Sequence, residues 1–356
     1  MANSNLTQAK NAKNDEFYTQ YHDIEKEINA YLDFNPNVFK GKTILMPCDD
    51  PEWSNFTKFF AQNFARLGLK KLISTSYAPD SKVHKGGYQI TLFEEKAPQF
   101  DPNKTNTNGK IFTLDHDITG DGKIDVNDLE WHYLKGDGDF NSPEIKKLRD
   151  EADFIITNPP FSLFRQFLAW IMEAQKQFCI IGNMNAITYK EVFPLIKNNK
   201  MWLGNGFQAG NAFFSTPNVK EYAEGVYDVE TGLVKFRNCC WFTNIDHGRR
   251  HRPLPLMTMQ ENIKFSKHKE IKGNEYAKYD NYDAIEVSFT DSIPKDYDGV
   301  MGVPISFLDK YSPEQFEIIG CSYDYGRPEG WAKNISMSVT VNNENIYKRI
   351  LIKHKK

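Results

Sequence analysis

The sequence lacks several features that mark specialised classes of protein. It has no apolar run of eighteen or more residues, so no transmembrane helix is expected. Residues 1–14 are polar and lack the apolar stretch of a signal peptide. The five cysteines are scattered without a C-x-x-C pair, which predicts reduced and mostly buried thiols. We therefore expect a cytoplasmic protein that does not associate with a membrane.

A strong charge imbalance is also missing. The formal net charge of −3 gives no overall attraction to nucleic acid, so the distribution of charge is more informative than its sum. Basic residues gather at 247–252, continued at 264–272, and again in the tail 348–356, whereas acidic residues gather at 115–139. The basic segments, both in the C-terminal half, are the candidate surface for a polyanion.

Apolar residues in the first part of the chain alternate between strand and helix spacing. Aromatic residues at three- and four-residue spacing predict a helix over 54–67, ended by Gly68, between apolar runs at 42–46 and 71–77. Such an order is typical of a βαβ unit in a parallel sheet. Further helices are expected at 15–32, 143–152 and 162–175, and further strands at 153–157 and 178–182, with a hairpin-like insertion formed by 88–93 and 110–114.

These elements predict an α/β protein with a doubly wound, mostly parallel sheet. The expected organisation is a mobile N-terminus (1–14), a catalytic domain (15–210) with an insertion at about 80–135, and a C-terminal region (211–356) that ends in strands. Ligands of such sheets bind at the carboxyl ends of the strands. Residues 48–51 and 158–161 both follow predicted strands, so we expect them to face one cleft. Trp241 and Phe242 are expected in the core.

The segment Asn158-Pro159-Pro160-Phe161 carries the most specific chemistry. Two consecutive prolines lack backbone donors and leave carbonyl acceptors, and the asparagine side chain adds another acceptor. Acceptors that converge on an amine hold its hydrogens and keep the nitrogen lone pair available for attack. The phenylalanine ring offers a stacking surface for a planar heterocycle. With a sulfonium as methyl donor, positioning rather than a strong base does most of the work.

Residues 157–161 (Thr-Asn-Pro-Pro-Phe) resemble motif IV of the amino-group methyltransferases. Residues 15–20 resemble the N-terminal motif that packs around the cofactor of these enzymes, and residues 136–140 resemble their Asp-Phe motif beside the cofactor adenine. Six stretches resemble the EcoRI-type adenine-specific modification methyltransferases in particular, and together they span most of the chain. They are residues 15–24, 48–58, 136–140, 157–165, 180–195 and 301–320.

This resemblance implies a Rossmann-like S-adenosylmethionine-dependent fold and methylation of the exocyclic amine of adenine in DNA. It implies that Asn158 and the Pro159 carbonyl, with Pro160 in the same turn, bind the target amine and that Phe161 stacks on the base. The cofactor residues that it implies are Phe17, Tyr18, Thr19, Asp49, Asp50, Pro51, Asp139 and Phe140. The chain departs from the family pattern in two places. Residues 52–55 replace the usual glycines, and residues 74–77 provide no carboxylate for the ribose.

A target adenine inside duplex DNA must be flipped out to reach such a pocket, which requires a second surface that grips the duplex. The candidates are Arg249, Arg250 and Arg252, since arginines bridge phosphates or read guanine. For each single arginine a solvated basic loop is an equal alternative. The region 211–356 is therefore expected to recognise the target in double-stranded DNA.

A second motif, at 117–128, matches a calcium loop of the EF-hand type at most positions. The candidate metal-binding residues of this loop are Asp117, Thr119, Asp121, Lys123 and Asp128. Thr119 stands where Asp or Asn is usual, so a structural Ca²⁺ site and a plain Asp/Gly-rich turn both remain open. A helix is expected to follow at 129–134.

The predicted function is site-specific N6 methylation of DNA adenine, in a restriction-modification system with a cognate endonuclease or as a solitary enzyme, by a monomer. Two alternatives remain. Similar motifs occur in methyltransferases of RNA bases and of protein glutamine side chains. A calcium-binding interaction module is the more distant alternative.

Overall fold

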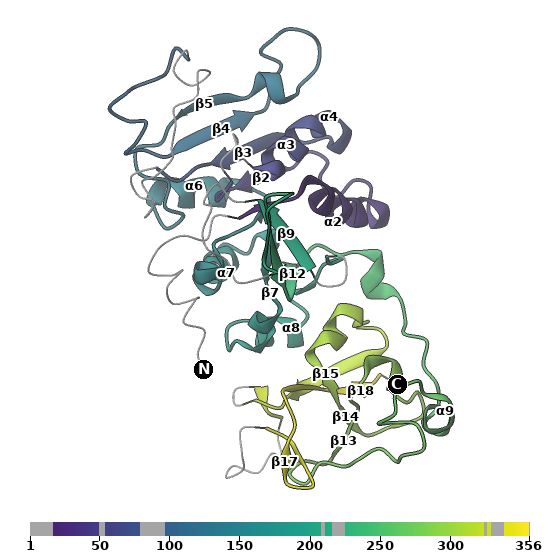
Figure 1. The fold of residues 1–356 in the computed structure, drawn as a ribbon. Coiled ribbons are helices and arrows are strands. Elements are labelled where there is room, and N and C mark those ends of the chain that lie inside the picture. Colours follow the sequence, from purple (N-terminus) through teal and green to yellow (C-terminus); the bar gives the residue numbers. More distant parts are fainter. Residues whose placement is uncertain are drawn as a thin grey trace. The chain divides into compact units, whose positions relative to one another are not determined.

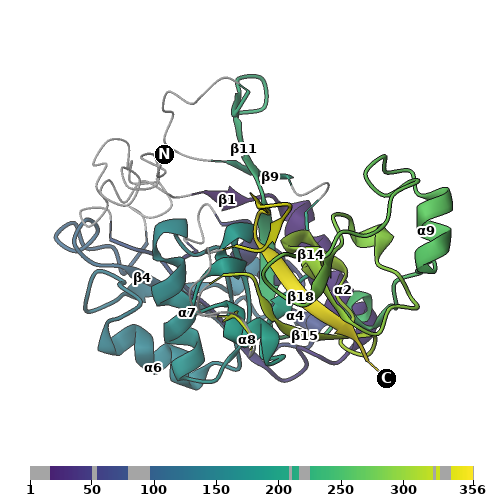
Figure 2. The ribbon, with the colours of Figure 1, turned by 90° about the horizontal axis from the view of Figure 1, so that it is seen from below.

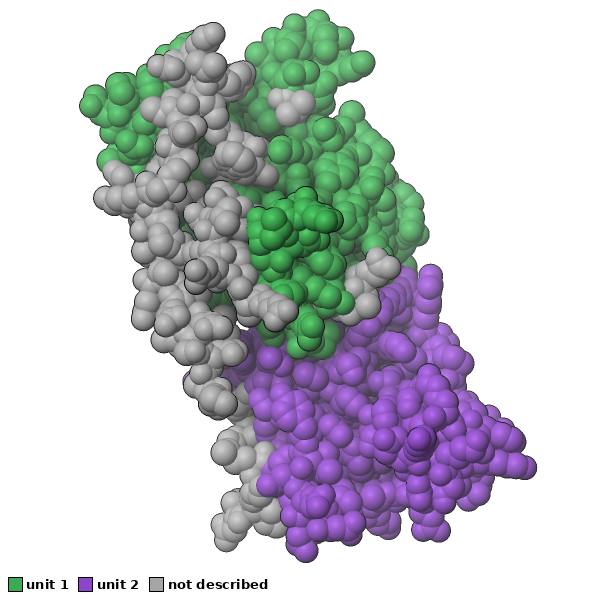
Figure 3. All heavy atoms as spheres, viewed as in Figure 1, with its two compact units in different colours: residues 1–184, 204–245 green, residues 185–203, 246–356 purple. Residues whose placement is uncertain are grey.

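The computed structural model describes residues 17–49, 54–78, 97–207, 211–215, 225–323, 326–328 and 338–355. It divides into two compact units, residues 1–184 with 204–245 and residues 185–203 with 246–356, which Figure 3 colours separately. The chain thus returns to the first unit after 203, and the described residues between 211 and 245 belong there rather than to the second unit. The expected mobile segment 1–14 and the expected strand 88–93 lie outside the described residues.

The structure contains an eight-stranded mixed sheet, and all of its strands but the last in the spatial order belong to the first unit. Its strands, in spatial order, are β5 (Glu130–Tyr133), β4 (Lys110–Leu114), β3 (Lys71–Thr75), β2 (Thr43–Met46), β6 (Phe154–Thr157), β7 (Gln177–Asn183), β12 (Cys239–Thr243) and β8 (Trp202–Leu203). The four central strands β3, β2, β6 and β7 are parallel. β4 runs antiparallel to β3 and β5, and β12 runs antiparallel to β7. The predicted α/β sheet is confirmed, but as a mixed rather than a mostly parallel sheet.

The predicted βαβ unit is present at the centre of this sheet. Every residue of β2 is buried, and helix α3 (Asn55–Gln62) begins where the Ser54 side chain accepts a hydrogen bond from the Phe56 amide. After a break at Asn63, α4 (Phe64–Leu67) ends at Gly68, whose φ of +63° is the left-handed conformation that favours glycine. The aromatic residues that predicted the helix are buried in the core.

The order of the central strands creates a switch point between β2 and β6. From β2 the chain moves to β3 on one side, and it later returns to β6 on the other side. Helices α2 (Tyr21–Phe34), α3 and α4 lie on one side of the sheet, and α6 (Pro143–Glu151) and α7 (Phe164–Glu173) lie on the other (Figure 1). The carboxyl ends of β2 and β6 therefore adjoin at the position where ligands of such sheets bind.

A second, antiparallel sheet of the first unit lies close to these strand ends. It has the order β1 (Tyr18–Thr19), β9 (Asn211–Ser215), β11 (Leu233–Arg237) and β10 (Tyr227–Asp228). β1 pairs with β9, so the segment that precedes the first helix meets a segment nearly 200 residues later in the chain, through Tyr18↔Ser215 and Thr19↔Phe214. This sheet brings residues from both parts of the chain towards the end of β6.

The second unit is built on a four-stranded sheet of the order β13 (Ala284–Glu286), β14 (Val300–Pro304), β18 (Arg349–His354) and β15 (Phe316–Cys321). Arg349 on β18 pairs with the buried Glu286 on β13 at 2.7 Å. The short helices α8 (Phe193–Lys197) and α9 (Met259–Phe265) belong to this unit, and α9 lies well away from the sheet in Figure 2. The expected C-terminal strand is confirmed as β18.

The helix expected at 129–134 is wrong, because this segment forms strand β5. Trp131 and Tyr133 alternate with polar residues, and β5 pairs with β4 through Phe112↔Trp131 and Lys110↔Tyr133. Apolar and polar residues alternate at period two in this segment, which is the pattern of a strand. This pattern outweighs the helix that normally follows a calcium loop. Trp241 and Phe242 are fully buried, as expected. Among the described residues, no helix is both long and apolar enough to cross a bilayer.

Candidate active site

Asp49 joins the carboxyl ends of the two strands at the switch point. Asp49 is 3% exposed, and its carboxylate accepts a hydrogen bond at 2.7 Å from Ser54, the N-cap residue of α3. The hydroxyl of Thr157, the last residue of β6, donates to the other carboxylate oxygen. The hydroxyl of Ser74 on β3 donates to the Asp49 backbone carbonyl. Asp49 thus joins the ends of β2 and β6, the edge of the sheet at which the two loops were expected to face one cleft.

The side-chain amide of Asn158, directly after β6, has two ends with different surroundings. Its nitrogen donates to the Phe17 carbonyl at 2.6 Å. Its oxygen Oδ1 is buried and has no hydrogen-bond partner among the described residues. The Pro160 carbonyl accepts from the Leu163 amide at 2.9 Å, in the short 3-10 turn Phe161–Leu163. Asn158 Oδ1 is therefore an acceptor held in place and available to a donor from outside the described chain.

The ring of Phe161 belongs to a cluster of four aromatic rings from separate segments. Its centroid lies 6.4 Å from Phe17, in a nearly parallel arrangement, 5.5 Å from Phe236 and 6.1 Å from Phe214. Phe236 meets Phe17 edge to face at 4.6 Å. Phe214 lies on β9 and Phe236 on β11, so the small sheet and β1 surround the motif phenylalanine. The ring that we expected to stack on a base is thus set in an apolar aromatic wall.

The segment 136–140 lies at the carboxyl end of β3. The Ala78 amide donates to the Asp137 carbonyl at 2.7 Å, and Gly138 adopts a φ of +90°. A Cβ atom at Gly138 would stand 2.3 Å from the Ser76 carbonyl oxygen, so only glycine permits this approach. Asp139 accepts from the Asn141 amide at 2.8 Å, and Phe140 is buried against α7, 5.2 Å from Phe167. The segment therefore lies at a strand end, where the resemblance predicts a loop beside the cofactor. The Phe140 ring, however, packs in the core.

Polar atoms around these strand ends fit a polar cofactor. The hydroxyls of Thr19 and Thr75 are buried and have no hydrogen-bond partner among the described residues. Thr19 is held beside α3, since the Asn55 side chain donates to its carbonyl at 2.8 Å. Thr75 ends β3, where the family pattern has a carboxylate. Of the other expected cofactor residues, Asp50 and Pro51 lie outside the described residues.

Comparison with known proteins decides the family. A family model described as "Adenine-specific methyltransferase EcoRI" matches residues 5–355. The chain belongs to the EcoRI-type adenine-specific DNA methyltransferase family. It is 41% identical over 359 residues to "Type II methyltransferase M.EcoRI" of Escherichia coli, covering 99% of this chain and 97% of the relative. No solved structure gave a significant match.

Two mycoplasma proteins are also similar to this methyltransferase. "Type II methyltransferase M.MpnI" of Mycoplasma pneumoniae is 35% identical over 322 residues, covering 89% of this chain and 85% of the relative. "Type II methyltransferase M.MgeORF184P" of Mycoplasma genitalium is 32% identical over 359 residues, covering 98% of each chain. The prediction of an adenine-specific DNA methyltransferase is confirmed, which decides against a calcium module and against RNA or glutamine as the target.

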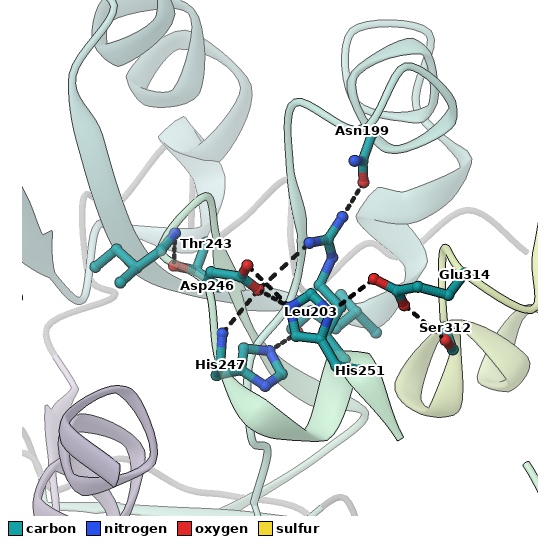
Figure 4. Close-up of polar contacts among 10 residues, drawn as sticks. Asn199, Leu203, Thr243, Asp246, His247, His251, Ser312 and Glu314 are labelled. Carbon is teal, nitrogen blue, oxygen red and sulfur yellow. Dashed lines mark hydrogen bonds and ion pairs between the residues drawn. The ribbon is translucent and has the colours of Figure 1, made fainter. Parts of the chain in front are cut away.

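The arginine cluster of the methyltransferase is largely occupied by contacts within the second unit, and Figure 4 shows the adjoining contacts of Asp246, His251 and Glu314. Arg250 is 7% exposed, contacts Asp246 at 3.3 Å, and lies 4.0 Å over the Trp202 ring. Arg249 pairs with Asp309. Arg252 is exposed and has no ion-pair partner among the described residues. Of the three expected DNA contacts, Arg250 is a structural residue and Arg252 is the most accessible.

The same network holds His251 between two carboxylates. Its ring nitrogens lie 2.8 Å from Asp246 and 2.7 Å from Glu314. Burial opposes the charged form of this ring, but the two carboxylates outweigh burial and raise the pKa of His251. At the neighbouring His247, whose Nε2 lies 3.0 Å from the Leu203 carbonyl, burial lowers the pKa. These contacts fix the turn 248–251 and leave little of it for a ligand.

The loop at 117–128 satisfies its carboxylates without a cation. Asp117 accepts from the amides of Gly120 and Gly122 at 2.7 and 2.8 Å. Asp128 accepts from the amides of Ile118, Thr119 and Asp125. Asp121 accepts from the Lys123 amide at 2.9 Å. Within the described part of the chain, no group of three or more ligand side chains is placed to hold a metal ion. Nothing in the structure supports calcium, and a self-bonded turn explains the loop.

Sequence reasoning missed Phe214, Phe236 and the buried Glu27 of α2. Glu27 accepts from Tyr31 at 2.5 Å and from the amides of Asn205 and Gly206 at 2.9 and 3.1 Å. The alternation of apolar residues in β9 and β11 was the available signal for the two phenylalanines. A buried acidic residue on an amphipathic helix has no signal in the sequence, because its partners are main-chain amides far along the chain.

Proposed function

We propose that this enzyme transfers a methyl group to N6 of an adenine flipped out of duplex DNA, and that residues 158–161 bind the target base. The observation that carries the proposal is the buried Oδ1 of Asn158 at the switch point of the sheet, which no donor among the described residues satisfies. A buried acceptor without a donor is costly, about 1–3 kcal/mol, and is rare unless a ligand satisfies it. The adenine amine is the donor that the family requires.

In this proposal Asn158 Oδ1 and the Pro159 carbonyl accept the two amine hydrogens. Such bonds keep the nitrogen lone pair out of the conjugation of the ring and direct it towards the methyl donor. Phe161 stacks on the base, and the surrounding rings of Phe17, Phe214 and Phe236 exclude water. Since no catalytic base is needed, the rate comes from positioning. Flipping the base costs a few kcal/mol, which stacking partly offsets.

S-adenosylmethionine, when bound, supplies a methyl group activated by its sulfonium. On a Rossmann-like arrangement of the central strands, the residues proposed to hold it are those around the carboxyl ends of β2 and β3. They are Phe17, Tyr18, Thr19, Asp49, Asp50, Pro51, Thr75, Asp139 and Phe140. Thr75 replaces the usual carboxylate, and its buried hydroxyl provides one acceptor for a ribose hydroxyl. Asp49 acts mainly through the bonds that align the two loops.

The second unit is proposed to recognise the target sequence in double-stranded DNA. Arg252 and, after release from Asp309, Arg249 would contact phosphates. We further propose that the enzyme acts as a monomer in the cytoplasm, where its DNA and cofactor are found. Its similarity to Type II methyltransferases supports a role in a restriction-modification system with a cognate endonuclease.

The experiment uses tritiated S-adenosylmethionine with duplex DNA, RNA and protein, followed by sequencing with detection of modified bases. We expect label in DNA alone, as N6-methyladenine in one short sequence. Asn158→Ala is expected to lower the single-turnover rate at least a hundredfold, with cofactor binding retained. Label in RNA alone, or an Asn158→Ala enzyme with the wild-type rate, would contradict the proposal.

A further inference from the structure

Within the part of the chain that the structure describes, a contact with a main-chain carbonyl orients the Asn158 amide. Its Nδ2 donates to the Phe17 carbonyl at 2.6 Å, while its Oδ1 is buried without a donor among the described residues. Rotating the amide by half a turn would place Oδ1 against the Phe17 carbonyl, where two acceptors repel, and would present the NH₂ group to the substrate. The carbonyl therefore selects the orientation that leaves the oxygen for a donor.

We propose that the main-chain carbonyl of Phe17 is a positioning group for methyl transfer, which locks Asn158 with its oxygen towards the target amine. This inference rests on the proposed role of Asn158. It adds that position 158 needs a donor and an acceptor on one side chain, the donor for Phe17 and the acceptor for adenine.

The Phe17 carbonyl is itself firmly held. The next two residues pair with β9, and the Thr19 carbonyl accepts from the Asn55 side chain at 2.8 Å. The Phe17 ring packs against Phe161 and Phe236, with centroids 6.4 and 4.6 Å away. Because contacts on both sides fix the Phe17 carbonyl, it does not move to suit a substituted side chain. Residue 158 must therefore supply the hydrogen-bond donor.

A carboxylate at position 158 meets only half of this requirement. In Asn158→Asp the ionised side chain has two acceptors and no donor, so one oxygen faces the Phe17 carbonyl unfavourably. The protonated carboxyl again has one O–H donor and one carbonyl acceptor, which reproduces the asparagine pattern. The activity of Asn158→Asp relative to wild type should therefore increase as the pH falls. A serine hydroxyl also donates and accepts, although it is shorter.

The experiment measures single-turnover methylation of a duplex substrate between pH 5.5 and pH 8.5, with each variant divided by wild type at the same pH. Above the pKa of the new carboxyl, we expect the Asn158→Asp ratio to rise up to about tenfold for each pH unit of acidification. At pH 8 we expect Asn158→Ser to exceed Asn158→Asp at least threefold. Asn244→Asp is the matched control, because the Asn244 amide also donates to a main-chain carbonyl, that of Lys176 at 3.0 Å, next to the first residue of β7 and away from the carboxyl ends of the strands. We expect its ratio to be independent of pH.

The outcomes separate this inference from the proposed function. If Asn158→Ala is inactive while the Asn158→Asp ratio is flat with pH, or Asn158→Asp matches wild type at pH 8, the lock is refuted and the role of Asn158 stands. If Asn158→Ala keeps the wild-type rate, the proposed role fails as well. Should Asn158→Asp fold poorly by circular dichroism, the comparison of Asn158→Ser with Asn158→Ala decides. Serine no better than alanine refutes the lock.

Discussion

Replacing Glu27 by alanine is expected to destabilise the methyltransferase by about 3–5 kcal/mol. The carboxylate is 1% exposed on the inner face of α2 and accepts three hydrogen bonds. One comes from the fully buried Tyr31 hydroxyl and two come from the amides of Asn205 and Gly206. Each buried donor left without an acceptor costs about 1–3 kcal/mol, and the two half-buried amides lie at the lower end.

The Glu27 carboxylate also lies so close to the turn at Gly204 that this position has no room for a side chain. A Cβ atom at Gly204 would stand 2.0 Å from a Glu27 carboxylate oxygen. The turn starts the return of the chain into the first unit, and Phe207 just beyond it stacks on Trp241 at 5.4 Å. Loss of Glu27 therefore loosens the segment that carries β9 and Phe214.

Urea unfolding followed by circular dichroism measures this effect as a shift of the midpoint at constant slope. Glu27→Gln keeps one acceptor oxygen and should lose only about 1–2 kcal/mol. Glu25→Ala removes an exposed carboxylate from the same helix and is expected within about 0.5 kcal/mol of wild type. If the free energy of unfolding of Glu27→Ala lies within about 1 kcal/mol of that of Glu25→Ala, the difference does not exceed the error of such comparisons. The three hydrogen bonds would then not stabilise the fold as argued.

Three further outcomes are expected. Gly138→Ala should lower stability by roughly 2–4 kcal/mol, read from the thermal midpoint, because its φ is +90° and its Cβ would stand 2.3 Å from the Ser76 carbonyl oxygen; an unchanged midpoint would count against the tight approach. Arg252→Gln should weaken DNA binding and reduce the slope of log K against log salt by about one, whereas the buried Arg250→Gln should mainly lower stability; equal salt slopes for both would contradict this assignment. Burial raises the pKa of the Cys239 thiol from 9.0 to about 12, because the folded protein disfavours the thiolate. The contribution of this thiol to the free energy of unfolding is therefore complete below pH 9 and is lost as the pH rises towards 12. Cys239→Ala should therefore flatten the alkaline loss of stability by about 1 kcal/mol per pH unit, measured by urea unfolding, and an unaltered pH dependence would refute the cause.

Local patterns predicted the centre of the fold well. The helix over 54–67 and its flanking strands follow from aromatic spacing and from Gly68, all of which act within a few residues. The proximity of the ends of β2 and β6 also followed, since parallel strands share one edge for their carboxyl ends. The hydrogen bond from the Thr157 hydroxyl to the Asp49 carboxylate joins these two strand ends.

The remaining parts depend on partners that are distant in sequence. Strand β9 pairs with β1, nearly 200 residues earlier in the chain, and β11 pairs with β9, so the position of these two short strands depends on partners that local patterns do not identify. The arginine cluster misled for a related reason. Charge density at 249–252 is visible in the sequence, but Asp246, Asp309 and Trp202, which occupy two of the three arginines, are identified only by the fold.

The motif at 157–161 specifies less chemistry than its residues suggest. Asn158 offers both a donor and an acceptor, and in our proposal the contact with Phe17, 141 residues earlier, decides which of them faces the substrate. Phe161 likewise gains its apolar wall from β9 and β11. An identical pentapeptide without β1 in place would present a freely turning amide and a solvated ring. If the proposed role of Asn158 holds, the reaction depends on the contact between the end of β6 and the segment that begins β1, so substitutions that detach β1 from β9 should reduce catalysis even where residues 157–161 are intact.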